Sequence, residues 1–234
     1  MARLKQRGLR VALTLLILAG VVAFWVLRPI RETDFATPGF TPLRDDALAA
    51  RFTPRIVGHK LYGAPTRMLY RMAKNTEGEI HIAYHPFYAD EENPHTGFGA
   101  AMSRLIYTGG LRLKDKMFGP ADIELIEVIL AKDGTPASLH WEDAENYQPR
   151  NFSVKHLPKT EKKPAIPFCF ETPTWNHMFT LVKPEACQTI QPLKVEYFSI
   201  ADWEKYKMVK KTEAIFRRNR MHRVYERQAA PGDG

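Results

Sequence analysis

The sequence predicts a mainly β protein, in which a β-sandwich follows one N-terminal transmembrane helix and precedes a long basic C-terminal helix. Three observations predict this fold class. Residues 11–27 form an uncharged apolar run. Residues 58–198 contain many short strand-like segments separated by turn residues, which is typical of a sandwich rather than a βαβ sheet. Residues 199–228 contain neither glycine nor proline and begin with a helix-capping pattern.

The apolar run of seventeen residues is bracketed by Arg10 and Arg28. Its length is at the short end of a bilayer-spanning helix, and no small-x-small cleavage site follows it. We therefore expect an uncleaved signal anchor rather than a cleaved signal peptide or a core helix. More basic residues precede the run than follow it, which places residues 1–10 in the cytoplasm. The expectation is a single-pass inner-membrane protein whose main domain lies in the periplasm, with the mitochondrial intermembrane space as the alternative.

The rest of the chain divides into four parts by composition. We expect a tether at 28–57 with a short helix over 45–52, a β-sandwich at 58–198, an amphipathic basic helix at 199–228 and a disordered tail at 229–234.

Alternation and turn residues predict the strands of the sandwich. In the segment 79–85, apolar and polar side chains alternate with the period of a half-buried strand. Turns at 75–78, at Gly109-Gly110 and at 132–134 predict three hairpins. The expected strands are 66–72, 79–85, 103–108, 111–117, 122–131, 135–141, 166–171, 177–182 and 192–198.

The net charge of +8 is concentrated at the two ends of the chain. Residues 1–34 carry six basic against two acidic residues, and residues 202–228 carry nine against four, whereas residues 35–201 carry nineteen of each. A neutral body argues against nucleic acid as a partner. The C-terminal arginines are either a solvated helix face or a contact for anionic lipid or a partner chain. They are Arg217, Arg218, Arg220, Arg223 and Arg227.

Cys169 and Cys187 are the two cysteines of the chain, and seventeen residues separate them. In an exported domain they allow one disulfide, and the alternative is two buried free thiols. Closing a loop of that size stabilises a fold by about 3 kcal/mol in the chain-entropy model. No CxxC motif is present, so a zinc ribbon or a thioredoxin-like redox role has no support.

Carboxylates at three positions suggest a cation site. Asp90 opens an acidic loop, and strand alternation places Asp122 and Glu124 on one face about 7 Å apart. Such oxygens suit Ca²⁺ or Mg²⁺, or they divide acid and base roles between them. The alternatives are an acidic surface turn and the solvent face of an exposed strand.

The histidines give no complete catalytic set. His81 and His85 share a strand face about 13 Å apart, too far for one metal ion. His140 and His177 each lie beside a tryptophan, which favours a structural role. The sequence contains no HExxH, GxSxG, Walker A or dinucleotide-binding motif, and this favours a protein that is not an enzyme.

In order and spacing, several segments resemble the necrosis-and-ethylene-inducing-peptide-like proteins and the related Vps62-like β-sandwich proteins. They are Tyr84–Asp90, Gly119–Glu124, Asp133–Pro136 leading to His140, His177, and Ile200–Trp203. The resemblance implies a β-sandwich in which an Asp, a His and the Asp and Glu of a heptapeptide hold a divalent cation. Asp90, Asp122 and Glu124 match those positions, but the heptapeptide histidines are replaced around Pro120 and Ala121.

Taken together, the sequence predicts a membrane-anchored β-sandwich that binds or supports components of the cell envelope. The expected partners are an envelope protein, anionic lipid or a glycan. The alternative is a cation-dependent hydrolase or a lipid- or glycan-binding protein that uses Asp90, Asp122 and Glu124.

Overall fold

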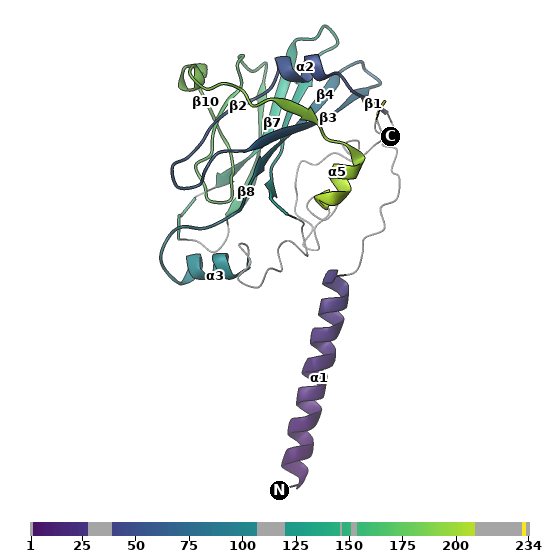
Figure 1. The fold of residues 1–234 in the computed structure, drawn as a ribbon, viewed down its shortest axis with the longest axis vertical. Helices are drawn as coiled ribbons and strands as arrows, with labels where there is room; N and C mark the ends of the chain where they lie inside the picture. Colours follow the sequence, from purple (N-terminus) through teal and green to yellow (C-terminus); the bar gives the residue numbers. More distant parts are fainter. Residues whose placement is uncertain are drawn as a thin grey trace. The chain divides into compact units, whose positions relative to one another are not determined.

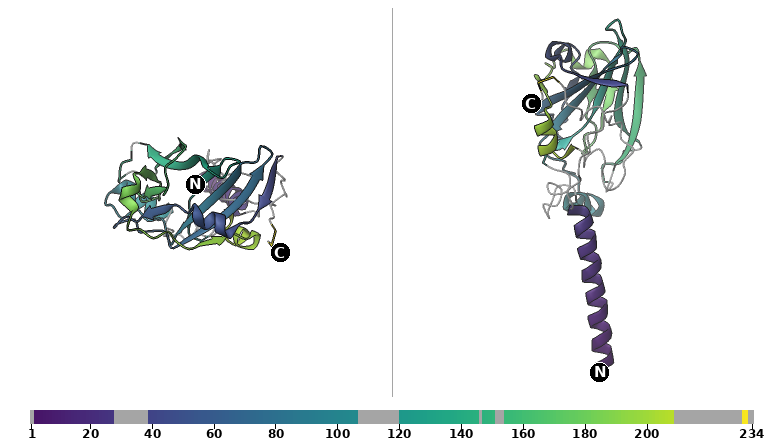
Figure 2. Two further views of the ribbon diagram at one scale, coloured as in Figure 1. Left: turned by 90° about the horizontal axis from the view of Figure 1, so that it is seen from above. Right: turned by 90° about the vertical axis from the view of Figure 1, so that its right-hand side faces the viewer.

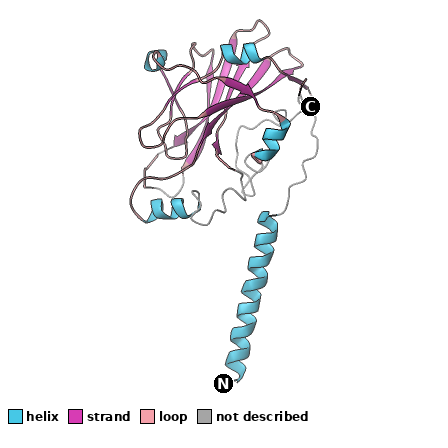
Figure 3. Cartoon of the chain, in the orientation of Figure 1, coloured by secondary structure: helices cyan, strands magenta, loops and turns pink. Residues whose placement is uncertain are grey.

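A computed structural model describes residues 2–27, 39–106, 120–145, 147–150, 154–208 and 231–232 of the chain. The chain forms two compact units, one spanning residues 1–32 and the other residues 33–234. We refer to the second unit as the β domain, because strands predominate among its described elements and its helices α2, α3 and α5 are short (Figure 3).

The first unit contains the helix α1 (Ala2–Leu27). The first half of the β domain contains β1 (Phe40–Leu43), α2 (Asp46–Arg51), β2 (Arg55–Val57), β3 (Arg67–Asn75), β4 (Ile80–Tyr88) and α3 (Phe98–Ile106). The second half contains β5 (Asp122–Ile123), β6 (Ile126–Leu130), β7 (Pro136–Glu145), β8 (Lys155–Lys162), β9 (Cys169–Glu171), β10 (Thr180–Val182), the 3₁₀ helix η1 (Pro184–Cys187), β11 (Val195–Tyr197) and α5 (Ile200–Lys205).

The main sheet has eight strands in the order β1-β3-β4-β6-β7-β8, with β11 also paired to β3 and β5 to β4 (Figure 1). All of its pairings are antiparallel except that of β11 with β3. Short turns join β3 to β4 and β6 to β7, which is the hairpin connectivity of antiparallel strands.

A second sheet of three strands has the order β10-β9-β2. The largest apolar cluster contains residues from both sheets, including Tyr84 and Val128 from the main sheet and Ile56 and Phe170 from the smaller one. Helix α2 adds Ala49 to the same cluster. A core built from two sheets is consistent with a β-sandwich-like fold, and the predicted mainly β class is confirmed at this level.

Helix α5 packs on the opposite face of the main sheet (Figure 2). Its Trp203 is buried together with Leu69 of β3 and Phe87 of β4. The helix begins as predicted, because the Ser199 hydroxyl accepts a hydrogen bond from the backbone N–H of Asp202 at 3.1 Å. The described part of the helix ends at Lys205, so the long basic helix expected over 199–228 is not shown. The five C-terminal arginines lie outside the described residues.

The two clearest hairpins are confirmed. Strands β3 and β4 pair around the turn at 75–78, and β6 and β7 pair around the turn at 132–134. Gly134 has φ +82°, in the left-handed region that glycine adopts without strain. The third predicted hairpin, at Gly109-Gly110, lies outside the described residues.

Two local expectations were wrong. Of the strand expected at 103–108, the described residues 103–106 belong to helix α3, whose apolar Phe98, Met102 and Leu105 recur at helical rather than strand spacing. Residues 40–57 do more than tether the domain, since β1 pairs with β3 and β2 pairs with β9. Pro42 is compatible with its strand because β1 lies at a sheet edge. The short helix expected over 45–52 is present as α2.

The predicted transmembrane anchor is also wrong. Among the described residues, no helix is both long enough and apolar enough to cross a membrane. The uncharged run at 11–27 has seventeen residues, fewer than the about 20 that a spanning helix ordinarily uses. The predicted inner-membrane location, cytoplasmic N-terminus and extracytoplasmic main domain depended on this anchor. Without the anchor these predictions have no support, and neither has the assignment to the periplasm and cell envelope.

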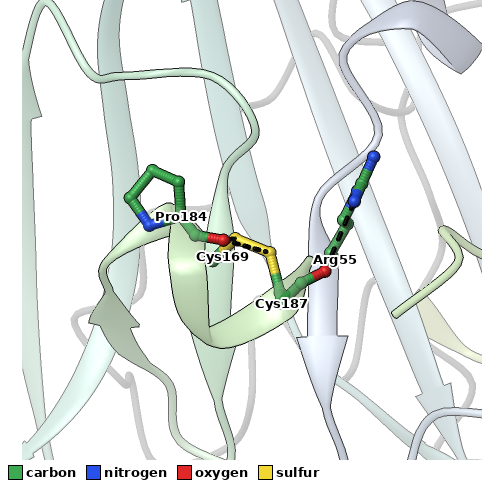
Figure 4. The surroundings of a disulfide bond; sticks show 4 residues. All are labelled: Arg55, Cys169, Pro184 and Cys187. Carbon is green, nitrogen blue, oxygen red and sulfur yellow. Dashed lines mark hydrogen bonds between the residues drawn. A yellow bond between two sulfur atoms is a disulfide. The ribbon is translucent and has the colours of Figure 1, made fainter. Parts of the chain in front are cut away.

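Cys169 and Cys187 are joined by a disulfide bond (Figure 4). Their Cα atoms are 5.9 Å apart, a usual separation for a disulfide. The bond connects β9 to η1, and the Arg55 guanidinium donates to the Cys187 carbonyl oxygen at 3.3 Å (Figure 4). A disulfide bond and a hydrogen bond therefore connect the smaller sheet to helix η1, which follows β10 in the chain.

Candidate functional site

The three carboxylates expected to bind a cation lie in different environments. Asp90 is exposed, and its carboxylate accepts a hydrogen bond from the neighbouring Glu91 N–H at 2.8 Å. Asp122 and Glu124 are buried, with 8% and 3% of their surface exposed. Among the described residues, no group of three or more His, Cys, Asp or Glu is arranged to hold a metal ion.

Asp122 instead contacts His177. The Asp122 Oδ2 to His177 Nδ1 distance is 2.7 Å, and His177 Nε2 lies 3.0 Å from the backbone oxygen of Tyr62. A backbone carbonyl only accepts, so Nε2 carries a hydrogen and donates it. One further proton is then shared between Nδ1 and the Asp122 carboxylate. The pair is therefore neutral overall, and it is buried, since only 2% of His177 is exposed.

Tyr88 lies against this pair. Its ring stacks on the His177 imidazole with a centroid separation of 3.7 Å, and its hydroxyl is 3.0 Å from the Thr172 hydroxyl. Burial raises the pKa of Tyr88 well above its ordinary value, the Thr172 hydrogen bond lowers it, and the charges of Glu124 and Asp122 raise it further. The Tyr88 hydroxyl therefore stays protonated where it contacts the Thr172 hydroxyl.

A tight turn directs His177 toward Asp122. Within it, the Thr174 carbonyl accepts from the His177 N–H at 3.2 Å, and the Thr174 hydroxyl accepts from the Met178 N–H at 2.9 Å. His177 has φ +56°, a left-handed conformation that is uncommon for residues other than glycine.

A second carboxylate–histidine pair contacts the same turn. Asn176, which precedes His177, has its Nδ2 atom 3.5 Å from His156 Nε2, and His156 Nδ1 is 2.5 Å from Glu142 Oε2. Two carboxylate–histidine pairs thus hold the segment 174–178.

Tyr62, whose carbonyl oxygen contacts the buried pair, lies in a turn closed by two backbone hydrogen bonds. His59 and Gly63 exchange both N–H···O=C bonds at 2.8 Å, and Gly63 supplies the positive φ of +81° that the turn requires. The His59 ring stacks on the Tyr62 ring at 4.3 Å. Because the Tyr62 carbonyl is the acceptor for His177, the turn is tied directly to the buried pair.

The Tyr62 hydroxyl joins two further segments of the chain. It is 2.9 Å from His95 Nε2 and 3.0 Å from the Tyr147 hydroxyl. We call Tyr62, His95, Tyr147 and His59 the tyrosine–histidine cluster. Its first three side chains are half-buried and His59 is exposed. Burial and the hydrogen bond shared with Tyr62 raise the pKa of Tyr147, which keeps this hydroxyl protonated.

Helix α3 fixes the position of His95. The Arg104 guanidinium donates to the carbonyl oxygens of Asn93 and His95 at 2.6 and 2.7 Å. The Asn93 side chain accepts from the His95 N–H at 3.1 Å and donates to the Pro149 carbonyl at 3.2 Å. The loop that carries His95 is therefore connected both to α3 and to the segment that carries Tyr147.

A separate row of polar side chains crosses the face of the main sheet that α5 partly covers. Strand register aligns Arg71, Ala83, Glu127, His140 and Thr160 on adjacent strands. Glu127 has no exposed surface and accepts from His81 Nδ1 at 3.0 Å. Arg71, only 2% exposed, donates to the Tyr197 hydroxyl at 2.6 Å and to the Phe198 carbonyl at 2.9 Å. Glu127 and Arg71 are thus buried and hydrogen-bonded within the protein, so neither side chain is exposed to a ligand.

No protein-family model, curated protein or solved structure matches the chain. Sequence reasoning identified Asp122 and His177 separately but did not pair them, because they are 55 positions apart in the chain. It missed Tyr62, His95 and Tyr147 as a group. A carboxylate inside an apolar strand, as at Glu127, is a signal that does predict a buried partner.

Proposed function

We propose that the β domain is a non-enzymatic binding domain that holds a neutral, hydroxyl-rich ligand, a glycan, on the tyrosine–histidine cluster. The single observation that carries the proposal is the position of the Tyr62 hydroxyl between His95 and Tyr147, with all three side chains half-buried. Three segments far apart in the sequence meet at this hydroxyl. A rigid, partly exposed group of this kind is what a binding site with a preformed geometry requires.

The chemistry of the cluster favours a glycan. Tyrosine hydroxyls both donate and accept, and a neutral imidazole offers one nitrogen of each kind, which matches the hydroxyl groups of a sugar. The ring faces supply apolar surface for the C–H groups of the same ligand. Exposed Asp90 and Glu92 lie in the loop that leads to His95, and their charge disfavours an anionic lipid at this place.

The buried Asp122–His177 pair holds the backbone of the tyrosine–histidine cluster in place. Its bond to the Tyr62 carbonyl fixes the turn at 59–63 and so limits the entropy lost when a ligand binds. With 8% and 2% of their surfaces exposed, these two residues position the site rather than contact the ligand. The resemblance to the necrosis-and-ethylene-inducing-peptide-like and Vps62-like proteins stays a prediction.

The test is calorimetric titration of the full-length chain with a panel of neutral hexose and N-acetylhexosamine oligosaccharides. Tyr62→Phe and Tyr147→Phe keep both rings and remove one hydroxyl each. Each is expected to weaken binding about fivefold, since one hydrogen bond contributes about 1 kcal/mol. Tyr206→Phe is the matched control, because that hydroxyl accepts from Arg67 outside the cluster and its loss leaves affinity unchanged.

Two results contradict the proposal. One is the absence of binding to every oligosaccharide of the panel. The other is an affinity in the Tyr62→Phe/Tyr147→Phe double variant equal to that of the wild type, when thermal melting shows that both proteins are folded. In that case any binding observed belongs to another surface.

A further inference from the structure

We propose that the outer edge of β8 is a docking surface for an acidic, extended segment of a partner protein, which joins the main sheet as an additional strand. This surface is separate from the tyrosine–histidine cluster, and the inference does not depend on the proposed glycan binding.

Strand β8 is the last strand of the main sheet. It pairs with β7 on one side, and none of the strands that the structure describes pairs with its other side. Six of its eight residues are exposed, and only His156 and Leu157 are half-buried. A long exposed edge of this kind offers backbone groups to an incoming strand.

The backbone direction along β8 follows from one hydrogen bond. The Lys163 N–H donates to the Ala137 carbonyl at 2.9 Å, so the peptide group between residues 162 and 163 directs its N–H toward β7. Because backbone groups alternate along a strand, the N–H and C=O groups of His156, Thr160 and Lys162 point outward. Pro158 also falls at an outward position, where its missing N–H costs the sheet nothing.

The side chains along this edge favour an acidic partner. Strand β8 contains Lys155, Lys159 and Lys162 against Glu161, a net charge of +2, and Lys163 follows directly. A strand that carries Glu or Asp places opposite charges beside these lysines, and such cross-strand pairs contribute about 0.2–1 kcal/mol each. A second copy of β8 brings a net charge of +2 against the same charge, which disfavours pairing between two copies of this chain.

The first measurement is amide hydrogen exchange in the full-length protein. Without a partner, the outward amides of Thr160 and Lys162 are expected to exchange quickly, and the inward amides of Lys159 and Glu161 slowly. Adding a hexapeptide of alternating Glu and Val slows exchange at Thr160 and Lys162 and leaves the inward amides unchanged. Outward amides that are unaffected by a peptide that binds contradict the proposal.

Variants then test the backbone and the charge separately by fluorescence anisotropy with the same labelled peptide. Thr160→Pro removes an outward N–H and is expected to abolish binding, whereas Thr160→Val keeps the N–H, removes the same hydroxyl and retains binding. Lys159→Glu/Lys162→Glu is expected to weaken binding about tenfold, a loss of about 1.4 kcal/mol. Lys194→Glu, an exposed lysine before β11 at the opposite edge of the sheet, is the charge control.

Three outcomes overturn the inference. They are equal binding of a peptide with Lys in place of Glu, full binding by Thr160→Pro, and protection of the outward amides that rises with protein concentration alone. The last result identifies a second copy of the chain as the occupant of the edge.

Discussion

Replacing Asp122 tests whether the buried pair holds the site together. The Asp122→Ala substitution leaves His177, which has 2% of its surface exposed, without the partner of its Nδ1 atom. Removing one member of a buried ion pair costs about 3–5 kcal/mol. For a domain of this size each kcal/mol lowers the melting temperature by about 2–4 °C, so we expect a decrease of about 10 °C.

Asp122→Asn separates the hydrogen bond from the charge. Because His177 Nε2 donates to the Tyr62 carbonyl, a neutral imidazole has a free acceptor at Nδ1, and the Asn amide can donate to it. This variant is therefore expected to cost only about 1 kcal/mol. The assays are thermal melting and urea unfolding, both followed by tryptophan fluorescence, with the exposed Asp90→Ala as the matched control. If Asp122→Ala unfolds at the same urea concentration as Asp90→Ala, the pair does not stabilise the domain and the reasoning fails.

Three further predictions concern the rest of the β domain. Burial raises the pKa values of Tyr84 and Tyr88 above their ordinary value of 10.0, so these tyrosines ionise at a lower pH in the unfolded chain than in the folded one. The urea midpoint should therefore fall as the pH rises above about 10, and a midpoint at about pH 11 equal to that at about pH 9 contradicts this. Reducing the disulfide between Cys169 and Cys187, which are 18 positions apart, should lower the unfolding free energy by about 3 kcal/mol in denaturant titrations with and without reductant. Gly134→Ala should cost about 1 kcal/mol in the same titration, since its φ of +82° strains any residue with a Cβ while no atom lies within 4 Å of the added carbon; a neutral effect would show that the turn relaxes.

Strand alternation and turn chemistry were sufficient to predict the centre of the main sheet. The segment 79–85 and the turn at 132–134 carry local signals, and β4 and the β6–β7 hairpin appear where they were expected. Local signals failed where tertiary contacts decide the structure. Strand β8 was not predicted because its exposed residues lack alternation, and register with β7 defines it.

The candidate site was only partly accessible to sequence reasoning. Asp122 was expected to face a cation, but its partner is His177, brought close by a turn that begins at Thr174. Tyr62 and Tyr147 lie 85 positions apart, and neither has a neighbouring motif that indicates contact. Hydrogen bonds of this range depend on how loops converge at the end of a sheet, which periodicity does not encode.

The most direct test of the central claim is a map of amide chemical-shift changes as a binding oligosaccharide is added to the full-length protein. The account predicts that the changes concentrate at residues 59–63, 93–95 and 147–149, the three segments joined by the Tyr62 hydroxyl. Changes confined to β8 or α5, with these three segments unaffected, would contradict it.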